Sequence, residues 1–125
     1  MARILVIMNH EPTEEQISQL KGMGYDEIVY LKHPPIPAEA GMMEVEEIWR
    51  ELVSKHWPPD ALWVQGDYRL FSIAFTVAEY NNIPLYVATT ERKAVEQRMS
   101  DGSIKKVSIF RHVRFVDVTE GVFIF

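Results

Sequence analysis

The chain alternates between short apolar runs and stretches in which apolar residues recur at helical spacing. Nearly continuous apolar runs are typical of strands buried on both faces of a parallel sheet, and they predict strands over residues 3–8, 27–31, 61–64 and 85–88. The helical stretches between them predict helices after the capping-box sequence Thr13-Glu14-Glu15-Gln16, over about 39–56 and over about 68–80.

The pattern changes after Thr90. An Asp101-Gly102 centre lies between strand-like arms at about 94–99 and 104–116, which indicates a β-hairpin. The whole order predicts an α/β fold, a minimal Rossmann-like parallel sheet flanked by helices with a C-terminal antiparallel β-hairpin. We find no linker or internal repeat, so residues 1–125 are expected to form a single domain. The apolar end at 122–125 is expected to pack on the body or across a dimer.

Composition narrows the class of protein. The chain has 125 residues, is 47% hydrophobic and contains no cysteine, which excludes disulfides, zinc ribbons and a thiol nucleophile. The longest apolar run, Ile4 to Met8, is too short to cross a bilayer, and no secretory leader is recognisable. We therefore expect a cytoplasmic protein that does not bind a membrane.

Charge is unevenly distributed. Residues 92–114 contain seven lysines and arginines against two acidic residues, a balance of +5, whereas the whole chain is −5 and the remainder is therefore −10. The acidic total argues against a binder of duplex nucleic acid. The basic segment has two interpretations, a local anion site or a solvated hairpin whose lysines protect its edge.

Polar residues follow each predicted parallel strand. Ligands of open α/β sheets bind beyond the carboxyl ends of the strands, so these segments are the expected site: Asn9-His10, Lys32-His33, Gln65-Gly66-Asp67 and Thr89-Thr90-Glu91-Arg92. The chain lacks G-x-G-x-x-G, the P-loop sequence and G-x-S-x-G. These absences disfavour a dinucleotide-binding domain, a P-loop NTPase and an α/β-hydrolase.

Several of these residues suit phosphate chemistry. His10 can exchange protons near neutral pH, but together with His33 it lacks a convincing third metal ligand, so no metal site is expected. Gly66 allows the backbone to approach a ligand, Gln65 is placed to contact a base or ribose, and Asp67 is expected to cap the next helix instead of leaving its N-terminus to a phosphate.

Two further segments carry hydroxyl, imidazole and guanidinium groups. Thr89, Thr90 and Arg92 suit a phosphodiester, because a guanidinium binds phosphate in a bidentate manner; capping threonines in a turn are the alternative. In Arg111-His112-Val113-Arg114, strand alternation predicts His112 and Arg114 on one face and Arg111 on the other.

These residues together resemble a CRISPR-associated family. Asn9-His10 with Thr13-Glu14-Glu15-Gln16, Val64-Gln65-Gly66-Asp67, Ala88-Thr89-Thr90-x-Arg92 and Phe110-x-His112-Val113-x-Phe115 resemble the Csx-twenty family of type III CRISPR loci. The resemblance implies a relative of the CARF domain, a homodimer that binds cyclic oligoadenylate, and ring-nuclease activity with no cofactor. The apolar C-terminal tail and Tyr68-Arg69 depart from the expected pattern.

The implied reaction is attack of each ribose 2′-OH on the adjacent phosphate, which leaves a 2′,3′-cyclic phosphate. Under this hypothesis Arg92 stabilises charge, Thr89 and Thr90 position phosphate oxygens, and His10 or His112 acts as acid or base. The remaining expected ligand contacts are Asn9, Gln65, Gly66, Asp67, Arg111 and Arg114. Two alternatives remain open: a sensor or sponge that binds the ring without cleaving it, and a different enzyme on the same scaffold, such as one that processes nucleotides or deaminated bases.

Overall fold

The computed structural model describes residues 2–120. Eight elements follow one another, namely β1 (Ala2–Met8), α1 (Glu14–Gly22), β2 (Tyr25–Lys32), α2 (Met42–Val53), β3 (Ala61–Val64), α3 (Tyr68–Asn81), β4 (Leu85–Arg98) and β5 (Ile104–Asp117). They form an α/β fold with one five-stranded mixed sheet, so the predicted fold class is confirmed.

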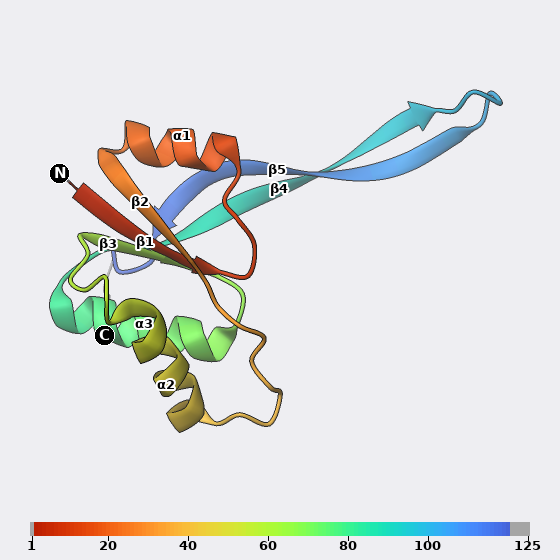
Figure 1. The fold of residues 1–125 in the computed structure, drawn as a ribbon. Coiled ribbons are helices and arrows are strands. Elements are labelled where there is room, and N and C mark those ends of the chain that lie inside the picture. Colours follow the sequence, from red (N-terminus) through yellow and green to blue (C-terminus); the bar gives the residue numbers. More distant parts are fainter. Residues whose placement is uncertain (1, 121–125) are drawn as a thin grey trace, which may run out of the picture.

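The sheet has the strand order β2-β1-β3-β4-β5. The pairs β1–β2, β1–β3 and β3–β4 are parallel, and β4–β5 is antiparallel. Helix α1 covers one face, and α2 and α3 cover the other (Figure 1). Because the chain leaves β1 toward α1 and leaves β3 toward α3, the β1–β3 boundary is the switch point where sheets of this order hold ligands.

The α2–α3 face contains the larger core. Alternate strand residues point to it, including Leu5, Ile7, Leu62 and Val64, and all four are fully buried. Helix α3 buries Leu70, Ala74 and Ala78 against them. The core of the chain itself therefore accounts for much of the apolar character of α3.

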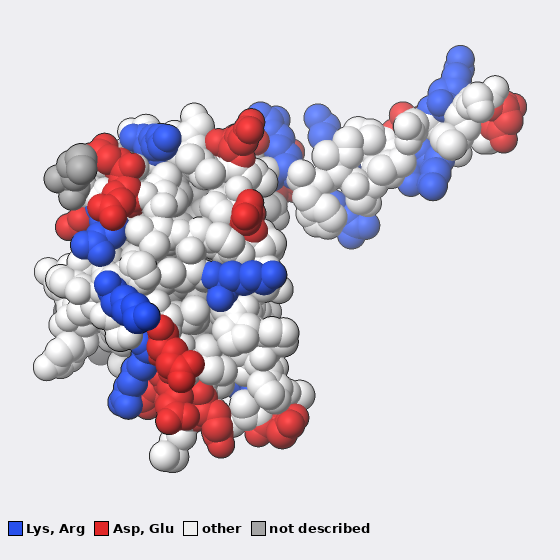
Figure 2. Space-filling model, viewed as in Figure 1, with Lys and Arg blue, Asp and Glu red and all other residues white. Residues whose placement is uncertain are grey.

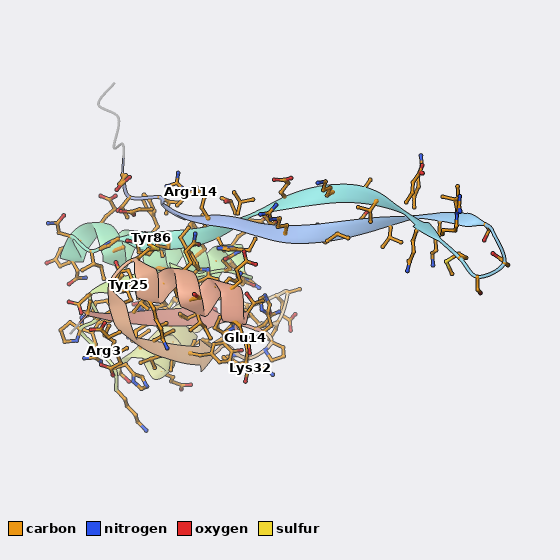
Figure 3. The ribbon with its side chains drawn as sticks, turned by 90° about the horizontal axis from the view of Figure 1, so that it is seen from above. Arg3, Glu14, Tyr25, Lys32, Tyr86 and Arg114 are labelled. Atoms are coloured by element: carbon orange, nitrogen blue, oxygen red, sulfur yellow. The ribbon has the colours of Figure 1, made fainter. Side chains whose placement is uncertain are left out.

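The α1 face is covered by one short helix. The predicted capping box is confirmed: Thr13 Oγ1 accepts from Gln16 N at 3.2 Å, and Gln16 Oε1 accepts from Thr13 N at 2.9 Å. Aromatic residues complete the cover, with Tyr25 and Tyr86 sharing a hydroxyl–hydroxyl hydrogen bond of 3.0 Å (Figure 3). Burial raises the pKa of the Tyr25 phenol well above its ordinary value.

Strands β4 and β5 are each 14 residues long and run beyond the carboxyl edge of the sheet as a two-stranded ribbon (Figures 1 and 3). The predicted exit at Thr89–Arg92 was wrong, because these residues continue β4 and pair with β5. The predicted hairpin centre is confirmed: Asp101 Oδ1 accepts from the backbone N and hydroxyl of Ser103, and Gly102 has a φ of +88°. Residues 91–111 are called the ribbon below.

None of the helices within residues 2–120 is long and apolar enough to cross a bilayer. The tail at 122–125 lies outside the described residues, so its packing stays a prediction.

Candidate functional site

A cleft of about 330 Å³ opens at the carboxyl end of β3. It is lined by Val64, Gln65, Gly66, Asp67, Tyr68, Phe71 and Val87. Tyr68 is 91% exposed, and with Phe71 it gives the cleft two aromatic side chains. Gly66 has a φ of +118°, a conformation that L side chains rarely adopt. The predicted exit after β3 therefore does border a cleft whose walls suit a flat apolar group such as a base.

Gln65 lies at this edge but points inward. Its Oε1 accepts hydrogen bonds from the backbone N of Ala88, at 3.0 Å, and from Trp63 Nε1. The amide oxygen thus joins β3 to β4 at the point where the regular pairing of these strands ends. Gln65 therefore supports the sheet. Its amide oxygen is occupied, so the expected contact with a base or ribose would have to be made by its amide NH₂.

Asp67 caps α3, as predicted. Its carboxylate accepts from Arg69 N at 2.8 Å and from Leu70 N, and it forms an ion pair of 2.7 Å with the Arg69 guanidinium. The hydrogen bond from the Arg69 side chain is the main cause that lowers the pKa of Asp67 to about 2. Arg69 Nη1 also donates to the carbonyls of Pro37 and Ala40. The helix N-terminus is consequently filled by a residue of the chain and not open to a phosphate.

His33 lies directly beneath Gly66 and is buried, at 6% exposure. Nδ1 donates to the carbonyl of Pro34 at 2.9 Å, and Nε2 faces Gly66. That atom is buried without a hydrogen-bond partner among the described residues, and a Cβ at position 66 would lie 2.8 Å from it. His10 and Asn9 are instead exposed, and His10 Nδ1 lies 3.2 Å from the carbonyl of Glu11.

The base of the ribbon brings together three of the four predicted catalytic residues. Thr90 pairs directly with His112, and Arg92 follows two residues along the same face. Arg92 Nε and Nη2 both donate to Ser108 Oγ, at 3.1 and 2.9 Å. Thr90 and Arg92 are exposed. We call Thr90, Arg92 and His112 the ribbon-base cluster.

His112 is held by α1. Its Nε2 lies 2.6 Å from Gln19 Oε1, its ring packs against Phe115 at 5.0 Å between centroids, and its Nδ1 is buried without a partner in residues 2–120. Sequence reasoning missed Gln19, because nothing distinguishes this residue from other polar positions of an amphipathic helix.

The expected common face for His112 and Arg114 was wrong. The β4–β5 register shifts between Thr89 and Thr90, so Val113 is an extra residue of β5. His112 and Phe115 consequently share the α1 face, and Arg114 turns to the other face with Thr89, whose hydroxyl donates to the Arg114 carbonyl at 3.0 Å. Arg114 lies at the β5 edge of the sheet (Figure 3). Arg111 faces away from His112, as alternation predicted.

The candidate residues thus form two groups on opposite faces of the sheet. The ribbon-base cluster lies on the α1 side, whereas Val87, which lines the cleft, and its neighbours Thr89 and Arg114 lie on the α3 side. Exposed lysines and arginines extend along the ribbon, and acidic residues dominate the lower part of the body (Figure 2).

Comparison with known proteins supplies one family. No curated protein matches the chain. A family model with the description "Uncharacterized protein MJ1673 family" matches residues 2–116, which include the cleft, the ribbon and all but the last residue of the sheet. Because this match covers nearly the whole chain, the protein belongs to the MJ1673 family.

Proposed function

We propose that the protein binds cyclic oligoadenylate, in particular cyclic tetra-adenylate, and opens the ring without a metal ion as a member of the ring-nuclease class. The observation that carries this proposal is the ribbon-base cluster, in which a hydroxyl, a guanidinium and an imidazole share one face of a basic ribbon. The resemblance to the Csx-twenty family supports the choice of ligand.

The reaction depends more on in-line positioning of the attacking oxygen and on stabilisation of the developing charge than on a strong base. The ribose 2′-hydroxyl loses its proton as its oxygen attacks the adjacent phosphorus, and the P–O5′ bond breaks. The leaving 5′-oxygen takes up a proton, so the products carry a 2′,3′-cyclic phosphate and a 5′-hydroxyl. Arg92 would donate to the phosphate oxygens as negative charge develops, and Thr90 would hold the same phosphate in line with the attacking oxygen. Positioning and electrostatic stabilisation of this kind each supply several kcal/mol of barrier reduction.

The cleft beside Gly66 is the corresponding base site. Tyr68 and Phe71 give it aromatic side chains, and Thr89 and Arg114 follow along the same face of the sheet. Since the ribbon-base cluster lies on the other face, one copy does not present both groups to the same nucleotide. We therefore expect a homodimer in which one ring contacts both copies.

Single-turnover incubation with cyclic tetra-adenylate and with cyclic hexa-adenylate, each in EDTA, tests this function. Linear products ending in 2′,3′-cyclic phosphate are expected. Arg92→Ala should slow ring opening at least 100-fold, about 2.7 kcal/mol of barrier. The matched control Arg50→Ala removes an exposed arginine of α2 and should leave the rate unchanged. An intact ring with the wild-type protein, or an unaltered rate in Arg92→Ala, would contradict the proposal.

A second candidate function is binding without cleavage, as a sensor or sponge. It is favoured by His112, whose Nε2 is occupied by Gln19 and whose Nδ1 is buried, so that neither nitrogen is presented to a ligand as a base. His10→Ala and His112→Ala test whether a histidine acts as acid or base in ring opening. Unchanged turnover in both would exclude histidine acid–base chemistry, and a bound but intact ring would establish the binder.

A further inference from the structure

The ribbon has little cover within its own copy. Ile104 is 60% exposed and Phe110 is 68% exposed, and Ile109 on the opposite face is also exposed. An isolated two-stranded hairpin is only marginally stable in water, and exposed apolar groups concentrated on one element mark an interaction surface. The ribbon therefore has the character of an arm that is buried by a partner.

The partner of this arm should be acidic. Salt bridges within residues 2–120 join Arg3 to Glu27, Arg50 to Glu46 and Arg69 to Asp67. None of them involves the cations of the ribbon, which are Arg92, Lys93, Arg98, Lys105, Lys106 and Arg111. These cations occupy both faces of the ribbon, because neighbours in a strand point in opposite directions.

The body carries a groove of matching chemistry beside the start of α2. It has a volume of about 430 Å³ and is lined by Glu39, Glu44, Glu47 and Glu51 around Pro37, Ala40 and Ile48. Not one of these glutamates forms a salt bridge in the described part of the chain. Like charges at this helical spacing repel each other, and an apolar floor with an acidic rim is complementary to a ribbon of apolar and basic side chains. We call this feature the acidic groove.

We propose that the ribbon of one copy docks in the acidic groove of a second copy. A ribbon does not reach the groove of its own copy, because β4 and β5 continue straight from the sheet and carry the ribbon away from α2 (Figures 1 and 3). The receiving groove adjoins the candidate base site. Arg69 donates hydrogen bonds to the carbonyls of Pro37 and Ala40, which line the groove, and forms an ion pair with Asp67, which lines the cleft. Docking thus places the cations of one copy beside the cleft of the other.

The ribbon and the acidic groove are the contact surfaces of the expected homodimer, and their docking does not depend on the ligand. Failure to bind cyclic oligoadenylate would therefore leave it standing, whereas a monomeric protein would overturn it.

Charge exchange provides the main test. The wild-type chain should sediment as a dimer at micromolar concentration. Lys105→Glu/Lys106→Glu in the ribbon and Glu47→Lys/Glu51→Lys in the groove should each weaken association at least tenfold, and the chain carrying all four substitutions should regain it. The control Lys21→Glu/Lys32→Glu, which makes the same charge change as the ribbon variant but outside both surfaces, should have little effect on association. Circular dichroism verifies the fold of each variant. A monomeric wild type, or association that neither reversal weakens, would refute the docking.

Engineered thiols provide a second test, because the chain has no cysteine of its own. A mixture of Ile104→Cys and Ile48→Cys chains should form a disulfide-linked heterodimer on mild oxidation, and Ser18→Cys on α1 should not link to Ile104→Cys. Comparable linking of both pairs would contradict the assigned groove. A monomer whose affinity for an oligoadenylate RNA falls on ribbon charge reversal would identify nucleic acid as the occupant and overturn the proposal.

Discussion

At the scale of single residues, Gly66 needs to be glycine for two reasons, its positive φ and its close approach to His33. Gly24 is the matched control, because it shares only the first of these reasons. Gly66 and Gly24 both have a positive φ, but a Cβ at position 66 would lie 2.8 Å from His33 Nε2, whereas nothing lies within 4 Å of a Cβ at position 24. Gly24→Ala should cost about 1–2 kcal/mol from backbone strain alone. Gly66→Ala should cost about 1–3 kcal/mol more, because the ring must move in a packed site. Urea denaturation measures the loss of unfolding free energy in both variants. Equal losses would show that the His33 ring moves aside without an energetic penalty.

Asp67 supplies a stability term that depends on pH. Its pKa is lowered to about 2 in the folded protein from the ordinary 3.8, so the stabilisation is complete above about pH 4 and is lost as the pH falls toward 2. We expect a contribution of about 1–2 kcal/mol, since solvent screens part of the ion pair. Asp67→Asn should lower the free energy of unfolding at pH 7 by that amount and should flatten its decline between pH 4 and pH 2. An unchanged slope over this range would assign acid sensitivity to other carboxylates.

At the scale of elements, α1 is a short helix that covers one face of the sheet together with aromatic residues such as Tyr25 and Tyr86, so its N-terminal cap should matter. Thr13→Ala removes the hydroxyl that accepts from Gln16 N, and such losses cost about 1 kcal/mol. Since Gln19 of α1 holds His112, fraying of the helix should also increase hydrogen exchange at the amide of His112 in β5. Thr76→Ala at an exposed position of α3 is the control, because Thr76 Oγ1 donates to the Ser72 carbonyl of its own helix. Equal exchange at His112 in both variants would mean that α1 does not restrain the ribbon base.

The elements also show what a sequence pattern can reveal. The parallel strands were predictable because burial on both faces leaves only apolar residues, as in Ile4 to Met8. The continuation of β4 through Thr89 to Lys93 was not, because cross-strand hydrogen bonds to β5 maintain it without a buried face. In the same way, Asp67 has a recognisable capping position, whereas the inward turn of Gln65 and the bulge at Val113 depend on tertiary packing.

At the scale of the whole molecule, the protein consists of an acidic body and a basic ribbon that contact each other mainly at the ribbon base (Figure 2). The body should therefore fold without the outer ribbon. Val95 and Val107 are register partners, so replacing residues 96–106 by Asn-Gly keeps Ser108, which binds Arg92, and leaves a two-residue hairpin loop of a favoured type. The truncated chain should retain the unfolding free energy of the body, because the cores on both sheet faces are made by residues outside the deleted segment.

The same truncation removes the outer cations and Ile104 while keeping Thr90, Arg92 and His112. If the ribbon acts only through its base, binding of cyclic oligoadenylate by the truncated chain should equal that of the wild type. If the ribbon also joins two copies, the truncated chain should be monomeric and should bind the ring at least tenfold more weakly than the wild type. Its denaturation midpoint should still equal that of the wild type when both proteins are measured at concentrations low enough for them to be monomers. Sedimentation, denaturation and ring binding on the one variant therefore separate a structural role of the outer ribbon from its role in assembly. A truncated chain that fails to fold would show that the ribbon stabilises the body, contrary to the independence that its few contacts with the body imply.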